Sequence, residues 1–405
     1  MRKAASDAKK VQEGNADIKA CYEVFLNYNC NAKCAFCSQG DFDKSLNAPL
    51  RDILRRILAG YKLGYRKVGF TGGEPLVHKD IFKVLAFSRA VGFPFIRVQT
   101  NGIKLADREF AAGAARAGLT YCKFSTVSHI PRVHDRLVGV PGAHEAVLTA
   151  IANLRALKIR IGMNIIVTRE TVGSLPATVD AYMRAGVGDF VVIYPVIMGA
   201  LKKNISKLGV SLPEAVPMIA EAMALSRSRG INSLCLNVPP CFLKDDVDSI
   251  IMGNFNTVVT DPTGRSWDLD ENRGESKIYG KPCSTCAMKG ECAGAEASYI
   301  EHFGWSGFVP FKGKIDAAAR KGVEGEPRRY FTDNERCFVE ILNRENGIPT
   351  ARVLELAKDI VLCRDCDDGN AVMSAGESLI KAGLIKRAEK KGVYYWTLLK
   401  PGLSI

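Results

Sequence analysis

From about residue 19 to residue 230, short apolar segments alternate with segments of helical periodicity. The apolar segments are rich in Val, Ile and Phe, and helical segments such as 48–64 and 144–158 separate them. Strands of this composition, alternating with helices, indicate βαβ units and a parallel sheet. Six units are too few for a closed eight-stranded barrel, so we predict an α/β fold, a partial (βα)6 barrel with its site at the C-terminal ends of the strands. The predicted strands are residues 21–27, 67–71, 95–100, 121–127, 160–167 and 189–196.

The pattern changes after a predicted helix at residues 211–229. The segment that follows has few long helical stretches and many Gly and Pro residues. Because such a segment buries little core on its own, we expect a bound metal centre to help it fold. We therefore predict four parts: a flexible leader (residues 1–18), the partial barrel (19–232), an irregular metal-binding domain (233–325) and a small C-terminal domain (326–405).

The C-terminal domain has the pattern of a winged helix. Its predicted helices are residues 333–343, 350–361 and 371–383, and a hairpin with its turn near Lys391 and Gly392 follows them. The domain carries 13 Lys and Arg against 12 Asp and Glu. Nucleic-acid-binding domains usually show a clear basic surface, so this balance argues against nucleic acid. Recognition of a peptide strand at the edge of the wing, or a docking or dimer surface, remains open.

The cysteine content demands an explanation of its own. The chain has 13 cysteines among 405 residues, in an ordinary globular balance of 47% hydrophobic and 24% charged residues. No apolar run reaches the ~18 residues that a membrane span requires. The polar start of the chain lacks the apolar core of a signal peptide, so we expect a cytoplasmic protein. Disulfides are rare in that reducing compartment, and metal binding is therefore the leading explanation for the cysteines.

Three cysteines, Cys30, Cys34 and Cys37, come directly after the first predicted strand. Thiolates are the usual ligands of iron–sulfur clusters, whereas a structural zinc site normally takes four protein ligands. Three thiolates can hold three irons of a [4Fe–4S] cube and leave the fourth iron open to chelate a substrate or cofactor. This chemistry is available at the C-terminal end of a barrel strand, where the site is expected.

The remaining cysteines fall into groups. Cys283, Cys286 and Cys292 form a second cluster in the irregular segment. Cys21 and Cys122 lie inside apolar, strand-like segments, and we expect them to be buried core residues. The pair Cys363 and Cys366 is weak evidence for a metal site, and we interpret it as exposed surface cysteines. No role is assigned to Cys337.

The segment CNAKCAFC, with Phe36 before the last cysteine, resembles the C-x3-C-x2-C signature of the radical S-adenosylmethionine (SAM) superfamily. Gly72, Gly73, Glu74 and Pro75 match that family's GGEP turn, which contacts the SAM amino group largely through its backbone. Thr100 and Asn101 end the third strand, as is frequent in the family. Ser125 matches a serine that often contacts the SAM ribose or carboxylate, and Asn164 on the fifth strand also fits. The resemblance covers residues 20–230.

Two of these positions have a simpler interpretation. Ser125 and Asn164 could be ordinary polar residues near strand ends. His134 and Asp135 also resemble a stretch of one large subgroup, but we expect them to cap or pin a loop. The same subgroup often carries Asp-Gly shortly after the position of Ser125, and this chain does not.

The resemblance implies a barrel of the radical SAM type, with SAM and a [4Fe–4S] cluster with an open iron as cofactors. In such enzymes the open iron chelates the amino and carboxylate groups of SAM, and one electron from the cluster breaks the S–C bond. The products are methionine and a 5′-deoxyadenosyl radical, which abstracts a hydrogen atom from the substrate. The cofactors carry this oxidoreductase chemistry, and the protein orients the reactive carbon.

The second cysteine cluster resembles the auxiliary-cluster domain of the same superfamily, in its SPASM or shorter twitch form. Glu296 stands where the longer form has a further cysteine, which favours one auxiliary [4Fe–4S] cluster. Cys241 is our first choice for the fourth ligand and Cys235 is the second. A structural zinc held by four of these cysteines is the alternative. Ligation by four cysteines favours a role in electron transfer.

The net charge of +13 belongs almost entirely to the residues before the C-terminal domain. It can steer an acidic reductant, such as flavodoxin or ferredoxin, or an anionic substrate, and it fits a merely soluble basic surface equally well. Two substrate classes remain open: a peptide or protein that the enzyme modifies, which we favour, and a small metabolite that it dehydrogenates or rearranges. A third possibility is an iron–sulfur regulatory protein that binds nucleic acid through the winged helix.

Overall fold

The computed structural model describes residues 20–312, 333–357 and 369–399, except for 254, 382 and 391. The expected leader, residues 313–332, and Cys363 and Cys366 lie outside the described residues. The chain divides into two compact units. The first comprises residues 1–58 and 66–327, and the second comprises residues 59–65 and 328–405.

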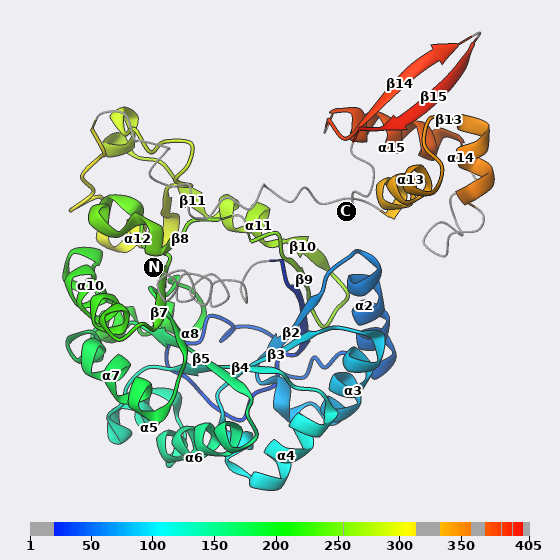
Figure 1. The fold of residues 1–405 in the computed structure, drawn as a ribbon. Coiled ribbons are helices and arrows are strands. Elements are labelled where there is room, and N and C mark those ends of the chain that lie inside the picture. Colours follow the sequence, from blue (N-terminus) through cyan, green and yellow to red (C-terminus); the bar gives the residue numbers. More distant parts are fainter. Residues whose placement is uncertain are drawn as a thin grey trace, which may run out of the picture. The chain divides into compact units, whose positions relative to one another are not determined.

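The first unit is organised around one curved sheet of ten strands, shown in Figure 1. The strand order is β10-β9-β1-β2-β3-β4-β5-β6-β7-β8, and every neighbouring pair is parallel except β9 and β10. The strands are β1 Tyr22–Asn27, β2 Lys67–Gly72, β3 Phe95–Thr100, β4 Tyr121–Thr126, β5 Arg160–Ile166, β6 Asp189–Ile193, β7 Asn232–Leu236, β8 Ile250–Ile251, β9 Val258–Thr260 and β10 Ser266–Asp268. The six predicted strands are β1 to β6, at the centre of this sheet.

The predicted number of strands was too low, because four more strands extend the sheet at its two edges. Strand β7 continues the parallel order beyond β6, and β9 pairs with β1 on the other side. These extra strands have only two to five residues. Segments this short carry too little alternation or apolar content to be recognised from sequence. Part of the segment expected to be irregular therefore completes the barrel sheet.

Helices connect the strands and surround the convex face of the sheet (Figure 1). Helices α3, α4 and α7 each end at a glycine with positive φ, which closes the helix without steric strain. Helix α10, predicted at 211–229, begins with a capping box between Ser211 and Glu214. The helices are α2 Leu50–Lys62, α3 Ile81–Val91, α4 Arg108–Ala117, α5 Pro131–Val138, α6 Ala143–Ala156, α7 Leu175–Ala185, α8 Gly199–Lys203, α9 Ile205–Leu208 and α10 Leu212–Ser228, with short 3-10 helices η1 Pro75–Val77, η2 Ile103–Ala106 and η3 Val172–Ser174.

The two faces of the sheet differ in chemistry. The convex face packs apolar side chains against the helices, and these are fully buried: Val24, Phe70, Val98, Phe124 and Met163. The concave face carries buried ion pairs that span alternate strands, between Glu23 and Arg97 and between Lys123 and Asp189. A Cβ atom on Gly162 of the intervening strand would lie 2.3 Å from Asp189 Oδ1. Glycine therefore makes room for the second ion pair inside the barrel.

The buried cysteines agree with the sequence prediction. Cys21 and Cys122 are both 0% exposed and lie in the core of the first unit.

Among the described residues, no single helix is long and apolar enough to span a bilayer. Helices α5 and α6 together have the length and apolar composition of a membrane span, but the chain bends by 103° between them.

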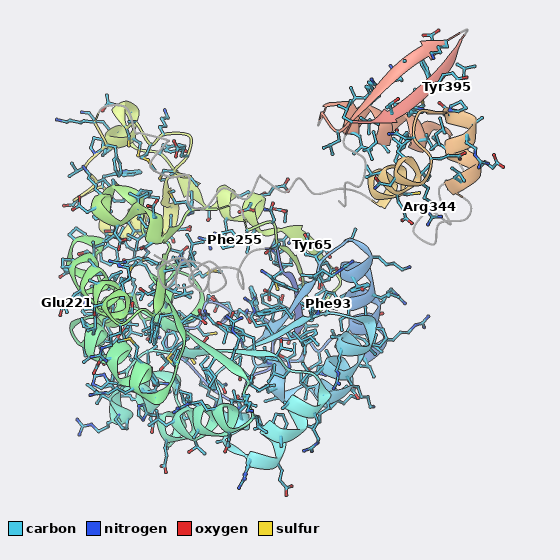
Figure 2. All side chains as sticks on the ribbon, in the orientation of Figure 1. Tyr65, Phe93, Glu221, Phe255, Arg344 and Tyr395 are labelled. Carbon is cyan, nitrogen blue, oxygen red and sulfur yellow. The ribbon has the colours of Figure 1, made fainter. Side chains whose placement is uncertain are left out.

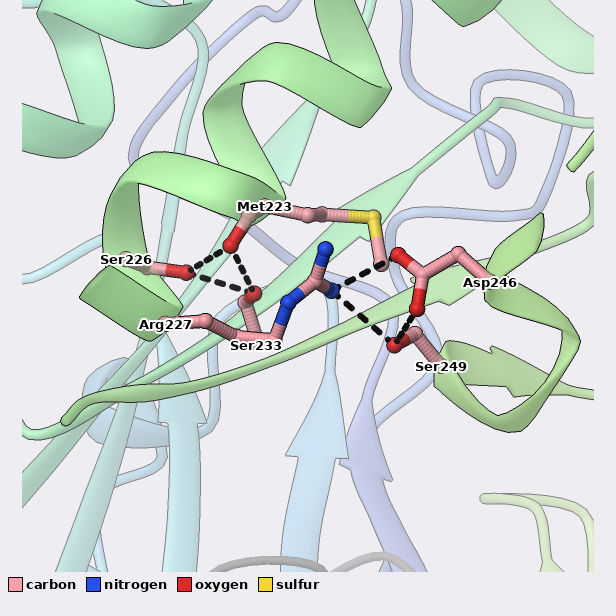
Figure 3. A network of polar contacts seen from close by, with 6 residues as sticks. All are labelled: Met223, Ser226, Arg227, Ser233, Asp246 and Ser249. Carbon is pink, nitrogen blue, oxygen red and sulfur yellow. Dashed lines mark hydrogen bonds and ion pairs between the residues drawn. The ribbon is translucent and has the colours of Figure 1, made fainter.

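After β7 the chain forms short elements, as the sequence predicted. They are η4 Pro240–Phe242, η5 Lys244–Ser249, α11 Leu269–Glu275, β11 Lys277–Ile278, η6 Lys281–Thr285, β12 Ala295–Glu296 and α12 Ala297–Phe303. A polar network shown in Figure 3 fastens η5 to helix α10. Arg227 Nη1 donates to Asp246 Oδ2 at 2.7 Å and to Ser249 Oγ at 3.1 Å, and Ser249 Oγ donates to Asp246 Oδ1 at 2.6 Å.

Aromatic contacts hold the same segment on the barrel. Tyr299 of α12 accepts a hydrogen bond from Leu212 N at 3.1 Å, and its ring lies 5.8 Å from the ring of Tyr194. Phe255, labelled in Figure 2, is 2% exposed and stacks under the guanidinium of Arg273 at 5.0 Å. The segment after β7 is thus packed against the barrel within one unit.

From residue 333 onward, the described residues of the second unit form three helices and a three-stranded antiparallel sheet of order β13-β15-β14. Trp396 is fully buried at its centre, where its ring meets Phe338 and its Nε1 donates to Thr350 Oγ1 at 2.8 Å. Its elements are α13 Asp333–Arg344, β13 Ile348–Pro349, α14 Thr350–Ala357, α15 Gly369–Lys381, β14 Ile385–Lys390 and β15 Val393–Leu398. The three predicted helices and the hairpin are found, except where they fall outside the described residues.

Candidate functional site

The first three cysteines lie on an irregular loop, residues 30–40, which we call the cysteine loop. Backbone hydrogen bonds fasten it to the end of helix α5, because Lys33 N donates to Val138 O at 2.9 Å and Ala35 N donates to Leu137 O at 2.8 Å. Since the loop begins directly after β1, these contacts fix it over the C-terminal ends of the strands. This is the position that the sequence predicted.

A second anchor comes from the start of helix α8. Ala200 N donates to Cys37 O at 2.9 Å, and the Asn204 side-chain amide donates to Ala35 O at 2.9 Å. Gly199 packs so closely that a Cβ atom there would lie 2.5 Å from Cys37 O. Asn204 was not foreseen, because no motif in the sequence marks it and its contact is formed only in the folded protein.

Phe36, expected beside SAM, packs together with Ala35 against an apolar cluster beneath the loop. The buried members of this cluster come from α5, α8, α9 and the loops around them: Val127, Leu137, Ile197, Leu201 and Leu208. Helices α5, α8 and α9 therefore form one support for the cysteine loop.

The three thiols influence one another. Burial is the main reason why the pKa of Cys34 is raised to about 12, and the neighbouring Cys30 and Cys37 contribute to that rise. Burial also raises the pKa of Cys30, although Ala32 N donates to its Sγ at 3.4 Å. Thiolates gathered in such a site repel one another, and bound cations would relieve that repulsion. The thiols therefore fit a metal centre.

The GGEP turn lies beside the start of the cysteine loop. Gly73 N donates to Asn27 O at 2.9 Å, and Glu74 N donates to Asn29 O at 2.8 Å. A Cβ atom on Gly73 would lie 2.1 Å from Asn29 O, so only glycine allows the two backbones to approach this closely. Gly72 and Pro75 flank this contact at the end of β2 and the start of η1.

Glu74 points inward and links the turn to strand β3. Its carboxylate is 1% exposed and accepts hydrogen bonds from Leu76 N at 3.0 Å, Thr100 Oγ1 at 2.7 Å and Asn101 N at 2.7 Å. Burial raises the pKa of Glu74 to about 7, against the lowering effect of these three bonds. The side chain thus ties two adjacent strand ends together.

Asn101 continues this link to the cysteine loop. Its Nδ2 donates to Asn31 Oδ1 at 2.7 Å and approaches Cys30 Sγ at 3.8 Å. Ser125 and Asn164 are paired in register on β4 and β5 and lie farther along the concave face. The structure therefore gathers the sequence-predicted residues at one end of the barrel.

His134 and Asp135 have the structural environment expected of loop residues. Asp135 accepts hydrogen bonds from Gly142 N at 2.7 Å and His144 N at 2.8 Å, which fixes the turn before α6. His134 is 2% exposed, and its Nδ1 lies 3.6 Å from Asp135 Oδ1, just beyond hydrogen-bond distance. Burial lowers the pKa of His134 to about 4, so the ring is neutral at pH 7.

The second cysteine cluster lines one pocket after the barrel. Cys241 joins Cys283, Cys286 and Cys292 there, together with apolar side chains that include Phe308 and Phe311. Burial raises the pKa of Cys241 to about 12, and Cys292, Cys286 and Cys283 each add to the shift. Gly294 N donates to Cys292 Sγ, and Phe311 N donates to Cys286 Sγ, both at 3.4 Å. Four thiols with N–H donors fit the donor set of an iron–sulfur centre.

Cys235, the second choice for a fourth ligand, lies elsewhere. It is 0% exposed within strand β7, where it pairs in register with Ile250 of β8. Burial raises its pKa, and no cysteine contributes to that shift. The structure therefore brings Cys241, and not Cys235, to the three cysteines of the second cluster.

Within the described ranges, no three His, Cys, Asp or Glu side chains converge closely enough to ligate one metal ion. One zinc ion holds its sulfur ligands about 2.3 Å from the metal, so those sulfurs must meet closely. A [4Fe–4S] cube gives each thiolate its own iron, and its ligands stand farther apart. Among the described residues, neither group of cysteines is therefore arranged around a single metal ion.

The structure thus combines an α/β barrel with two groups of cysteines, one directly after strand β1 and one after the barrel. Residues 24–181 match the family model described as "Radical SAM superfamily". This part of the chain is therefore similar in sequence to the radical SAM superfamily.

Two relatives with different names match part of the chain. A protein from Methanosarcina barkeri (strain Fusaro / DSM 804), described as Fe-coproporphyrin III synthase, is 28% identical over 220 residues, which cover 53% of this chain and 54% of the relative. A PqqA peptide cyclase from Rhodopseudomonas palustris (strain ATCC BAA-98 / CGA009) is 26% identical over 157 residues, which cover 38% of this chain and 41% of the relative. The chain thus spans about half the length, or less, of these curated relatives.

A solved structure shows the same fold. It is the crystal structure of Streptococcus suis SuiB bound to its precursor peptide SuiA, with a TM-score of 0.51 and 15% sequence identity. The match covers 65% of this chain and 63% of that chain. At this identity the likeness establishes the architecture alone.

Proposed function

We propose that the protein is a radical SAM enzyme that uses a [4Fe–4S] cluster on Cys30, Cys34 and Cys37. The observation that carries the proposal is the meeting of the cysteine loop, the GGEP turn and Asn101 at one end of a radical SAM barrel. When bound, the cluster and SAM supply reductive cleavage of the sulfonium, which yields a 5′-deoxyadenosyl radical able to abstract a hydrogen atom from a substrate.

The residues of the chain position these groups. The three thiolates hold the cluster, and Gly72 to Pro75 offer backbone atoms beside it. Glu74 keeps that turn and the end of β3 in register through its buried hydrogen bonds. Ser125 and Asn164 line the concave wall, where they can contact SAM. The buried ion pairs below them close the interior and help to exclude water.

We assign the pocket of Cys241, Cys283, Cys286 and Cys292 to one auxiliary [4Fe–4S] cluster of the SPASM or twitch kind. Glu296, which replaces a further cysteine of the longer form, forms an ion pair with Lys277 at 3.8 Å. That pairing supports a structural role for Glu296 and a single auxiliary cluster. Four cysteine ligands leave no open iron, so the cluster serves electron transfer with the substrate or with a donor.

The substrate we favour is a peptide or protein. Two relatives support this choice: one is described as a PqqA peptide cyclase, and SuiB was crystallised with a precursor peptide. In the second unit, which we interpret as a winged-helix domain, β14 pairs with β15 on one side only. Its other edge can accept an extended peptide strand.

A small metabolite is the alternative, supported by the relative described as Fe-coproporphyrin III synthase. A short peptide encoded beside the gene favours the first substrate class, and a biosynthetic operon without such a peptide favours the second. We also propose that the enzyme is cytoplasmic and draws electrons from flavodoxin or ferredoxin. The near-neutral charge of the second unit argues against a nucleic-acid partner.

Product analysis tests the proposal. Anaerobically reconstituted protein is expected to hold about eight irons, from two cubes. With SAM and dithionite it should release 5′-deoxyadenosine, and replacing Cys30, Cys34 and Cys37 together by Ala should abolish that release. Persistent cleavage in the triple variant would contradict the proposed site.

A further inference from the structure

One largely buried lysine lies beside the cysteines of the second cluster. Lys277, on strand β11, lines a pocket together with Cys292, Gly294 and Glu296. Cys292 and Gly294 also line the pocket of the four thiols, so the two pockets share a wall. The Lys277 side chain is only 11% exposed. Its positive charge is therefore placed next to a proposed cluster ligand and largely away from bulk water.

The pairing of β11 with β12 holds Lys277 in this position. Lys277 is opposite Glu296 in the antiparallel register, and its Nζ lies 3.8 Å from Glu296 Oε1. The Glu296 side chain is itself only 10% exposed. Salt and water screen buried charges much less than exposed charges. Both members of this ion pair therefore act strongly on groups nearby.

The charge of Lys277 acts on Cys292. Burial raises the pKa of the Cys292 thiol, whereas the Gly294 N–H group and the Lys277 charge lower it. Burial and the nearby Arg273 guanidinium lower the pKa of Lys277, whereas Glu296 and Cys292 raise it. A cation that favours the thiolate of Cys292 also favours additional negative charge on a centre bound to that thiolate.

A second lysine near the four thiols differs from Lys277 in its exposure. Lys289 lines the pocket of the four thiols, and its side chain reaches solvent. Its Nζ lies 5.7 Å from the centre of the Tyr279 ring. Because solvent screens an exposed charge, Lys289 should act on the four thiols more weakly than Lys277 does. The two lysines therefore form a matched pair for a test of buried charge.

We propose that Lys277 raises the reduction potential of the auxiliary cluster, and that Glu296 holds Lys277 in place and offsets part of its charge. This inference rests on the proposed function, because it requires a [4Fe–4S] cluster on the four thiols. Reduction adds one electron to that cluster and makes or breaks no bond to the protein, so the surrounding residues meet one more negative charge. A largely buried cation beside Cys292 stabilises that charge, which makes the cluster a better electron acceptor.

The test is a redox titration of the auxiliary cluster alone. Replacing the three cysteines of the cysteine loop by Ala in the full-length protein leaves one cluster, whose reduced form is followed by electron paramagnetic resonance. Four variants are compared in this background: Lys277→Met, Glu296→Gln, both together, and Lys289→Met. Methionine removes the charge and keeps a long side chain, and glutamine removes the charge and keeps the shape of glutamate.

The two single variants of the ion pair should move the potential in opposite directions. With Lys277→Met, the ratio of reduced to oxidised cluster at a fixed solution potential should fall at least about tenfold, which corresponds to about 59 mV for a one-electron couple. Glu296→Gln should raise the potential, because the Lys277 charge is then no longer offset. The double variant should lie between the two single variants, and Lys289→Met should stay within about threefold of the background protein. A merely structural disturbance would not produce shifts of opposite sign.

A potential that Lys277→Met leaves unchanged, that Glu296→Gln fails to raise, or that Lys289→Met lowers as far as Lys277→Met does would overturn the inference. So would loss of the cluster from both single variants of the ion pair while Lys289→Met keeps it, because the pair would then only hold the site together. A background protein that binds no second cluster, or binds zinc, would instead contradict the proposed function, so the two failures are distinguishable.

Discussion

Gly199 is the most informative position for a substitution by alanine. Its φ of +55° lies in the left-handed region, where a residue with a Cβ atom costs about 1–2 kcal/mol. The new Cβ would lie 2.5 Å from Cys37 O and 2.6 Å from Ser38 O, and both are backbone atoms that cannot rotate away. The cysteine loop must shift, which breaks the hydrogen bond from Ala200 N to Cys37 O. That bond contributes about 0.5–1.5 kcal/mol, so the total destabilisation is about 2–3 kcal/mol.

The effect should be confined to the first cluster. We expect reconstituted Gly199→Ala protein to hold about four irons in place of about eight, and to lose 5′-deoxyadenosine formation. Iron content and visible absorption of anaerobic samples measure the first effect, and urea unfolding followed by circular dichroism measures the change in stability. Gly173→Ala is the matched control, because a Cβ atom there meets nothing within 4 Å. A Gly199→Ala protein with both clusters and wild-type activity would refute the role that we assign to Gly199 in fixing the cysteine loop.

Three further predictions follow from buried groups. In Glu74→Gln, the amide NH2 group would face Asn101 N–H or one of the other donors, and two donors cannot bond to each other. We therefore expect the free energy of unfolding, measured with urea, to fall by about 1–3 kcal/mol and SAM cleavage to be slower. Unchanged stability would contradict the bridging role of Glu74. Cys241→Ala should lower the iron content by about four while dithionite-driven SAM cleavage remains, and Cys235→Ala should keep both clusters; the reverse result would identify Cys235 as the ligand. The buried ring of His134 has its pKa lowered from 6.5 to about 4, so the unfolded chain takes up its proton first as the pH falls. The contribution of His134 to the free energy of unfolding should therefore drop by about 3 kcal/mol between pH 6.5 and pH 4, so the difference in stability between the wild type and His134→Leu should change by that amount over this range; a difference that does not vary with pH would exclude this residue as the cause.

The sequence alone predicted the central six strands because their runs of Val, Ile and Phe are long enough to be distinctive. It missed β7 to β10, which pair in the sheet although each is short and, taken alone, unremarkable. Their pairing depends on the edge that the other strands provide. Local pattern cannot reveal a contact of this kind.

The cysteines show the same division between local pattern and tertiary contact. Spacing identified the ligand candidates in each triad, but it could not choose between Cys235 and Cys241. The choice follows from topology, because Cys235 lies inside strand β7, and Cys241 lies in the turn that meets the triad. The anchors Gly199 and Asn204 are likewise about 160 residues from the loop that they hold. Their role exists only once the barrel has closed around them.

The most direct test of the central claim is the response of the first cluster to SAM. A variant with Cys283, Cys286 and Cys292 replaced by Ala retains only the cysteine-loop centre, so its electron paramagnetic resonance spectrum reports on one cluster. After anaerobic reconstitution and reduction, we predict a single [4Fe–4S] signal whose g values change when SAM is added, because the iron without a cysteine ligand is open to SAM. A reduced cluster whose spectrum is identical with and without saturating SAM would contradict the assignment.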